Sequence, residues 1–224
     1  MNWFVKRNIF QTAGLLVFYS LIFVSAGTIH YWQGWLFCLT FTAATLAIGV
    51  YLINYDRPLL ERRMRFGPLQ ESRPIERILM TITLLAFIAL LIVAGLDHRF
   101  GWSRVPPAIV VIANLLMAAG FALTLIVLRA NSYAASTITV ERGQRVISTG
   151  PYSYVRHPMY TGALFMIAAM PIALGSWWGL VPIAVAMPAL IARIFDEERA
   201  LSTELPGYVE YCRVVPYRLL PHVW

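Results

Sequence analysis

The segment GPYSYVRHPMYTG, residues 150–162, gathers polar and aromatic side chains between two apolar stretches of the chain. Pro158 suits the first turn of a helix, where its missing N–H costs nothing, so we expect a helix to begin there with His157 at its N-terminus. A helix N-terminus offers free N–H groups and a positive dipole end, which favour a bound carboxylate. The segment therefore indicates a binding site. The alternative is that Arg156 and the tyrosines are interfacial residues that lie at the membrane boundary without a further role.

A second cluster begins where the last apolar stretch ends, in the sequence ARIFDEERALSTELPGY. Arg193 and Glu197 are four residues apart and so share one face of a helix. Because both emerge directly from an apolar helix, at a depth where ionisable groups are costly, they are candidates for a functional role. The alternative is a solvated surface ion pair, which contributes little to stability and fits Asp196 and Glu198 better.

Other familiar site signatures are absent from the sequence. It has no GxGxxG or GxxxxGK[ST] phosphate loop, no HExxH and no CxxC, so we expect neither a soluble nucleotide-binding domain nor a metal site. The two cysteines, Cys38 and Cys212, imply no disulfide framework. The net charge of +7 does not indicate nucleic-acid binding, because the excess Lys and Arg residues flank apolar segments.

Composition identifies the elements that must position these clusters. Hydrophobic residues make up 59% of the 224 residues and charged residues 13%, against roughly 25% charged residues in soluble domains. Apolar runs of about 20 residues predict an all-α fold, a polytopic integral membrane helical bundle. We expect four spans, over residues 9–29, 34–54, 76–96 and 106–128. Two shorter segments, 160–174 and 177–192, form either a helical hairpin or two tilted crossings, which gives five to six membrane segments in all.

No repeat or linker divides the chain, so residues 1–224 are expected to form a single membrane domain. Residues 1–128 would hold four transmembrane helices with their connecting loops, and residues 129–224 the region that carries both clusters. Within the latter, TITVERGQRVIS (residues 137–148) is interpreted as two short strands around a turn at Gly143. The first 27 residues resemble a signal peptide, but we expect them to remain as the first span, because several spans follow.

The distribution of positive charge predicts the orientation. With a cytoplasmic N-terminus and six crossings, all Lys and Arg residues lie inside except Arg99 and Arg104. The inner set includes Lys6, Arg7 and Arg142. Both termini, both polar clusters and the loop DRPLLERRMRFGPLQESRPIER are therefore expected on the cytoplasmic side. That loop is either a helix on the anionic leaflet or a solvated linker.

The two clusters together resemble a known family. QRVISTGPYSYVRHPMYTG, followed about 30 residues later by R-x3-E-E-x2-L and then by GYVEYCRVVPYRLLP, resembles the isoprenylcysteine carboxyl methyltransferase family. Membrane phospholipid methyltransferases share a looser version of the pattern. The resemblance covers roughly residues 129–221. It implies methyl transfer from S-adenosyl-L-methionine (SAM), bound in a cytosolic pocket that the C-terminal segment roofs.

The resemblance also implies roles for particular residues. Arg193, facing the substrate carboxylate, and Glu197, binding the amino-acid end of the cofactor, would be the catalytic pair. The cofactor would be lined, largely through backbone, by Gln144, Arg145, Val146 and Ile147. The pocket would continue through Tyr152, His157, Pro158, Met159 and Tyr160. The partners implied are a lipophilic or prenylated substrate and membrane lipids, with no nucleic acid and no obligate protein partner.

The residue types suit this chemistry, although several acceptors remain open. A carboxylate acceptor, with a reference pKa of about 4, is already ionised and needs no general base, so positioning and desolvation would carry catalysis. A phosphatidylethanolamine-type amine must lose a proton and would need Glu197 or His157 as base. A third possibility is an NADPH-dependent enzyme similar to the membrane sterol reductases, and a fourth is a non-catalytic membrane scaffold.

Overall fold

The computed structural model describes residues 3–71, 73–140 and 143–224, with side chains from Gly14 onward. Four long helices come first, namely α1 (Trp3–Ala26), α2 (Trp32–Tyr55), α4 (Pro74–Phe100) and α5 (Pro107–Ala130). Short α3 (Arg57–Met64) and a 3-10 turn, η1 (Pro68–Gln70), lie between α2 and α4. After a second 3-10 turn, η2 (Gly150–Ser153), come α6 (Pro158–Ala173), α7 (Leu180–Glu204) and α8 (Tyr208–Val214).

This architecture confirms the predicted all-α membrane bundle. By length and composition, α2, α4 and α5 are each able to cross a membrane, and Gly14–Ala26 and α6 are shorter apolar helices. In the described residues there are eight α-helices and no strand. Arg142, counted above among the inner charges, lies outside the described residues, as do the side chains of Lys6 and Arg7.

The prediction of two strands over residues 137–148 is wrong for the part of that stretch that the structure describes. Residues 137–140 and 143–148 are irregular, with Gly143 in the left-handed region at φ 80°. An isolated pair of strands is marginally stable unless a third strand or a helix covers it. Here the preceding residues are instead held by side chains, because Arg62 and Arg63 of α3 donate to the carbonyl oxygens of Ser132 and Ala134.

The last two apolar segments form a helical hairpin through residues 174–179, where Gly175 adopts φ 76°. Pro171 and Pro188 lie inside α6 and α7 without ending them. Helix α7 continues to Glu204, well past the expected end of the apolar segment at residue 192. Its second half is rich in Glu, Arg, Ala and Leu, which favour helix, and the charges of Arg193, Asp196 and Glu198 are paired as described below.

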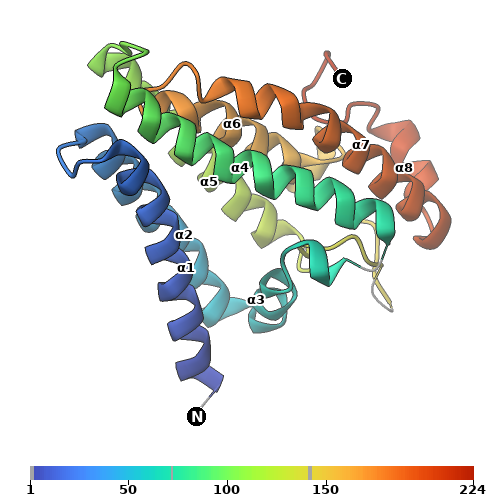
Figure 1. The fold of residues 1–224 in the computed structure, drawn as a ribbon. Helices are drawn as coiled ribbons and strands as arrows, with labels where there is room; N and C mark the ends of the chain where they lie inside the picture. Colours follow the sequence, from blue (N-terminus) through green and yellow to red (C-terminus); the bar gives the residue numbers. More distant parts are fainter. Residues whose placement is uncertain (1–2, 72, 141–142) are drawn as a thin grey trace.

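Helices α4, α5, α6 and α7 run alongside one another, and the α1–α2 pair leans away from them (Figure 1). Helices α5 and α6 approach each other closely, since a Cβ atom at Gly120 would lie 2.8 Å from the carbonyl oxygen of Gly162. Small residues at such a crossing let backbones approach closely, as is common in membrane bundles. Gly162, in the segment singled out above, thus fixes α6 against α5.

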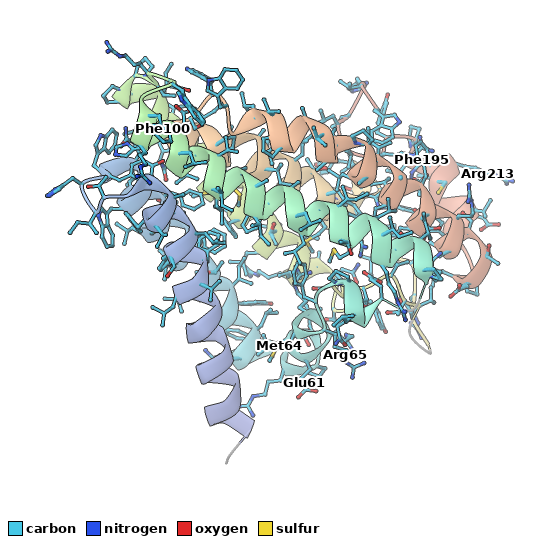
Figure 2. All side chains as sticks on the ribbon, viewed as in Figure 1. Glu61, Met64, Arg65, Phe100, Phe195 and Arg213 are labelled. Atoms are coloured by element: carbon cyan, nitrogen blue, oxygen red, sulfur yellow. The ribbon has the colours of Figure 1, made fainter. Side chains whose placement is uncertain are left out.

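The connections divide between two ends of this layer. Phe100, at the end of α4, lies at the opposite end from Phe195 and Arg213 (Figure 2). Near the second end lie α3, the irregular 131–157 segment, the C-terminal part of α7 and α8 (Figure 1). The two polar clusters are therefore brought to one end of the bundle, while Arg99 and Arg104 lie at the other.

Candidate functional site

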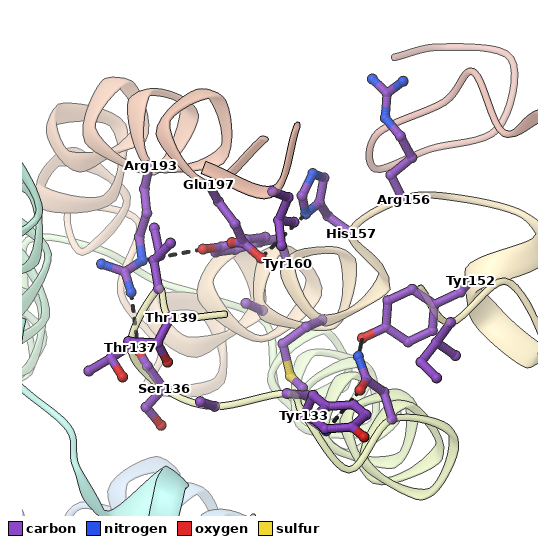
Figure 3. Close-up of a pocket in the computed structure, with 18 of the residues that line it drawn as sticks. Tyr133, Ser136, Thr137, Thr139, Tyr152, Arg156, His157, Tyr160, Arg193 and Glu197 are labelled. Atoms are coloured by element: carbon purple, nitrogen blue, oxygen red, sulfur yellow. Dashed lines mark hydrogen bonds and ion pairs between the residues drawn. The ribbon is translucent and has the colours of Figure 1, made fainter. Parts of the chain in front are cut away.

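A cavity of about 350 Å³ lies where the 131–157 segment meets α6, α7 and α8 (Figure 3). Its walls include ten of the residues singled out from the sequence: Gln144, Arg145, Val146, Ile147, Tyr152, His157, Met159, Tyr160, Arg193 and Glu197. Pro158 does not line the cavity; it is the first residue of α6. The cavity is also lined by residues that were not predicted from the sequence, among them Arg63, Asn131, Tyr133, Tyr208 and Tyr211.

Helix α6 begins as expected, with His157 at the N-cap and Pro158 in the first turn. The C-terminal segment is bound to this helix start. The backbone N–H groups of Arg156 and His157 donate to the carbonyl oxygens of Tyr217 and Arg218, each at 2.9 Å. The Thr161 hydroxyl donates to the Leu219 carbonyl at 2.7 Å. The C-terminal segment therefore caps α6 and holds this wall of the cavity.

Glu198 joins three elements rather than lying in solvent. Its carboxylate contacts the Arg156 guanidinium at 2.8 Å, His157 Nε2 at 3.2 Å and Arg218 Nε at 2.8 Å. Burial by itself would raise the pKa of Glu198, but the hydrogen bonds from His157 and Arg218 and the charge of Arg156 lower it below its usual range. Asp196 is likewise paired, with Arg73 at 2.9 Å. The interpretation of both acids as solvated is therefore wrong.

Arg193 projects toward the cavity from α7, as does Glu197 one turn later (Figure 3). The Arg193 guanidinium is fully engaged by groups of the protein. It binds Glu71 at 2.8 Å and also Glu76, donates to the Ser136 carbonyl at 3.1 Å and, through Nε, to the Tyr160 hydroxyl at 3.2 Å. A substrate carboxylate at Arg193 would thus have to replace a glutamate.

The two glutamates could not be recognised from sequence position. Glu71 and Glu76 are 2% and 0% exposed, yet they belong to a loop and helix start that look like a basic surface region. The one sequence feature that could have pointed to a buried ion pair is that both are acidic residues among arginines beside an apolar span. The ion pairs they form with Arg193 cross more than 110 residues of sequence.

Glu197 differs from the other acids of this region. In the described part of the chain no arginine or lysine pairs with it; His157 Nδ1 lies 3.9 Å from its carboxylate, and the Tyr160 hydroxyl donates a hydrogen bond to it. Its side chain is 26% exposed and lines the cavity. This carboxylate is therefore available to a cationic group of a ligand.

Tyrosines supply the remaining polar surface. The buried Tyr208 side chain lines the cavity, and its hydroxyl lies beside the Cys212 thiol. The Tyr152 hydroxyl accepts a hydrogen bond of 2.9 Å from Asn131 Nδ2. Burial raises the pKa of Tyr152 to about 12, so that its hydroxyl stays protonated at neutral pH.

The cavity fits the methyl donor that the sequence resemblance implies. Its volume is within the range of roughly 300–1,000 Å³ typical of small-molecule sites. A carboxylate without an arginine or lysine partner among the described residues suits an ammonium group, and tyrosine rings suit a sulfonium. Apolar Val146 and Ile147 provide a surface for a purine base.

Comparison with known proteins agrees with this geometry. Residues 108–205 match the phospholipid methyltransferase family. Delta(14)-sterol reductase TM7SF2 of Mus musculus is 32% identical over 91 residues, which is 39% of this chain and 22% of that relative. The chain thus spans about a fifth of the length of the curated relative it matches. The family match covers α5, α6 and α7 and, with the apolar helices, supports an integral membrane methyltransferase; α3, Glu71, Glu76 and the C-terminal segment lie outside it.

Proposed function

We propose that this protein transfers a methyl group from SAM to a lipophilic acceptor at the cytoplasmic face of a membrane. One observation carries the proposal. The polar segment that begins α6 and the Arg193/Glu197 end of α7 line a single cavity, and this cavity lies largely within the region that matches a methyltransferase family.

The cavity residues divide into cofactor and acceptor walls. Glu197 would bind the ammonium of the cofactor, residues 144–147 and Tyr208 its other polar groups, and Tyr152, His157, Met159 and Tyr160 would complete the pocket. When bound, the cofactor supplies an electrophilic methyl group on a sulfonium. The protein then has to orient the acceptor and exclude water, which are the contributions that a buried, aromatic cavity makes best.

The acceptor wall points to a lipophilic molecule. Met80 and Thr83 of α4, Met166 and Ile167 of α6 and Leu190 of α7 line the cavity at the level of the apolar helices. We propose carboxyl O-methylation of an isoprenylcysteine-like or other membrane-embedded acid, because an ionised carboxylate needs no base. An amine acceptor such as phosphatidylethanolamine would require Glu197 or His157 to take a proton.

Titration of the detergent-purified protein with SAM and with NADPH, by calorimetry, tests the proposal. We expect SAM to bind and NADPH not to bind. The similarity to a Delta(14)-sterol reductase favours a second candidate, an NADPH-dependent reductase, and binding of NADPH alone would establish it in place of the methyltransferase. Binding of neither would leave a scaffold role. Tritiated SAM, incubated with lipophilic acids and with phosphatidylethanolamine, then identifies the acceptor class.

Substitution of Glu197 tests the cofactor assignment. Glu197→Gln removes the carboxylate that has no arginine or lysine partner among the described residues, and we expect SAM affinity to fall about tenfold or more, the usual size of a lost charge-assisted hydrogen bond. Glu204→Gln is the matched control, because Glu204 is an exposed acid of the same helix that does not line the cavity. Equal SAM affinity in the two variants would remove Glu197 from the cofactor site.

A further inference from the structure

The cavity contains four arginines, and their partners distinguish them. Arg193 is held by Glu71 and Glu76, and Arg156 by Glu198. Arg145 is exposed, so that water solvates its charge. Arg63 alone is both half-buried and, within the described residues, without an acidic partner.

Within the described residues the Arg63 side chain makes one hydrogen bond, from Nη1 to the carbonyl oxygen of Ala134 at 3.1 Å. The rest of its fork has no carboxylate partner in that part of the chain. Burial lowers the pKa of Arg63, and the neighbouring Tyr152 acts against this shift. A half-buried guanidinium in a cavity wall favours an anion supplied by a ligand, since planar pairing with carboxylate or phosphate is what this group does best.

Tyr152 provides a second donor close by. Its oxygen already accepts from Asn131, so its own proton remains free to be donated. Because the hydroxyl is protonated at neutral pH, it would donate a hydrogen bond to an anion beside Arg63. As a neutral group it would not repel that anion. The two side chains come from different elements, α3 and η2, and line one cavity.

The position of Arg63 indicates which ligand brings the anion. Helix α3 connects α2 to α4, two helices able to span a membrane, so it lies at the level where lipid headgroups would be. Phe66, just after α3, also lines the cavity and is 60% exposed. Arg63 is outside the region that matches the methyltransferase family, whereas the residues proposed for the cofactor are mostly within it.

We propose that Arg63 is the binding residue for the anionic headgroup, a phosphate or a carboxylate, of the lipophilic methyl acceptor. This inference rests on the proposed function, because the bound lipid is a methyl acceptor only if the protein transfers methyl groups. Binding of the anionic headgroup at Arg63 does not itself require turnover. It also gives the carboxylate expected at Arg193 another partner, because Arg193 is already neutralised by protein groups.

The test compares lipids that differ only in charge. The full-length protein in a neutral detergent is titrated with dioctanoyl phosphatidic acid and with dioctanoylglycerol, and separately with dodecanoic acid and dodecanol. We expect the charged member of at least one pair to bind roughly tenfold more tightly, as a charge-assisted hydrogen bond would give. The pair that shows the preference tells phosphate from carboxylate.

Two variants locate that preference. Arg63→Gln should abolish it and Arg63→Lys should keep part of it, while SAM affinity stays within about twofold of the wild type. Arg62→Gln is the matched control, because Arg62 also donates to a carbonyl of the same loop, that of Ser132 at 2.6 Å, but does not line the cavity. It should retain the preference in full.

Each other result overturns the inference. Equal loss in the Arg62 and Arg63 variants would mean that the arginines only hold the loop. A tenfold loss of SAM affinity in Arg63→Gln, with the lipid preference intact, would assign the anion to the cofactor. No preference in the wild type would leave Arg63 without an anionic ligand. Failure of the wild type to bind SAM would instead refute the proposed function, while the lipid titration still reports on Arg63.

Discussion

At the scale of single residues, pairing determines which charges a ligand can reach. Glu71, Glu76, Asp196 and Glu198 each contact an arginine, and Glu197 contacts none in the described part of the chain. A buried ion pair is costly to form and more costly to break, because the remaining partner is left as an unpaired buried charge. The pairs around Arg193 therefore serve to position α7 and the 131–140 segment, whereas the charge of Glu197 is not neutralised by an arginine or lysine of the described residues.

Removal of Arg193 should reveal this positioning role. Arg193→Ala leaves Glu71 and Glu76 buried without a counter-charge, and we expect a loss of about 3–5 kcal/mol of folding free energy. At roughly 2–4 °C per kcal/mol for a chain of this size, the unfolding temperature should fall by about 10 °C. Thermal unfolding of the detergent-purified protein measures the change.

A triple variant separates charge from packing. Arg193→Met combined with Glu71→Gln and Glu76→Gln removes all three charges, and replacement of a whole buried ionic group by neutral side chains is often tolerated. It should recover most of the lost stability. If Arg193→Ala unfolds at the wild-type temperature and loses only turnover, Arg193 instead faces the substrate carboxylate, as the family resemblance predicts.

At the scale of elements, the C-terminal segment is bound to the start of α6. The carbonyl oxygens of Tyr217 and Arg218 accept hydrogen bonds from the backbone N–H groups just before α6, and that of Leu219 accepts one from the hydroxyl of Thr161 in its first turn. Arg218 also lies over the rings of Phe195 and Trp224, 5.0 and 5.5 Å from their centroids. Glu198 completes this contact, since it links α7 to both α6 and the C-terminal segment.

Acidic pH should weaken this link between elements. The pKa of Glu198 is lower in the folded protein than in the unfolded chain, so its contribution is complete above the ordinary carboxyl pKa of about 4 and is lost as pH falls through the folded value. We expect Glu198→Gln to lower the unfolding temperature at pH 7, and the gap to the wild type to narrow below about pH 4. Thermal scans from pH 7 to pH 3 measure it, with Glu204→Gln as control; a gap that widens in acid would contradict the assignment.

The elements also show how far a single sequence can be interpreted. Apolar length and Pro158 predicted the helices and the start of α6 correctly, because those signals are local. The strands over residues 137–148 were predicted incorrectly for the described part of that stretch, since its alternating pattern has no partner strand among the described residues, and side chains of α3 and α7 hold the preceding residues instead. Glu71, Glu76 and Arg63 were missed for a related reason. Their significance depends on contacts across the fold, which spacing along one chain does not encode.

At the scale of the whole molecule, charge and cavity are found at the same end of the bundle. Loops 56–73 and 131–157 and the C-terminal segment gather there and carry most of the arginines, while the connections at residues 27–31, 101–106 and 174–179 lie at the other end (Figure 1). Such asymmetry is the usual determinant of membrane orientation. We propose that the cavity opens toward the cytoplasm, where SAM is made.

Labelling of single cysteines in the full-length chain tests this orientation. Cys38 and Cys212 are first replaced by serine, and one cysteine is then introduced at Trp102 or at Glu204, both exposed and at opposite ends of the bundle. A membrane-impermeant maleimide should label Trp102→Cys in intact cells and Glu204→Cys only after the membrane is permeabilised. The reverse pattern would place the cavity outside, away from the cytosolic methyl donor. Because 16 of the 18 Lys and Arg residues would then face outward, that result would also require an insertion mechanism that overrides the charge rule.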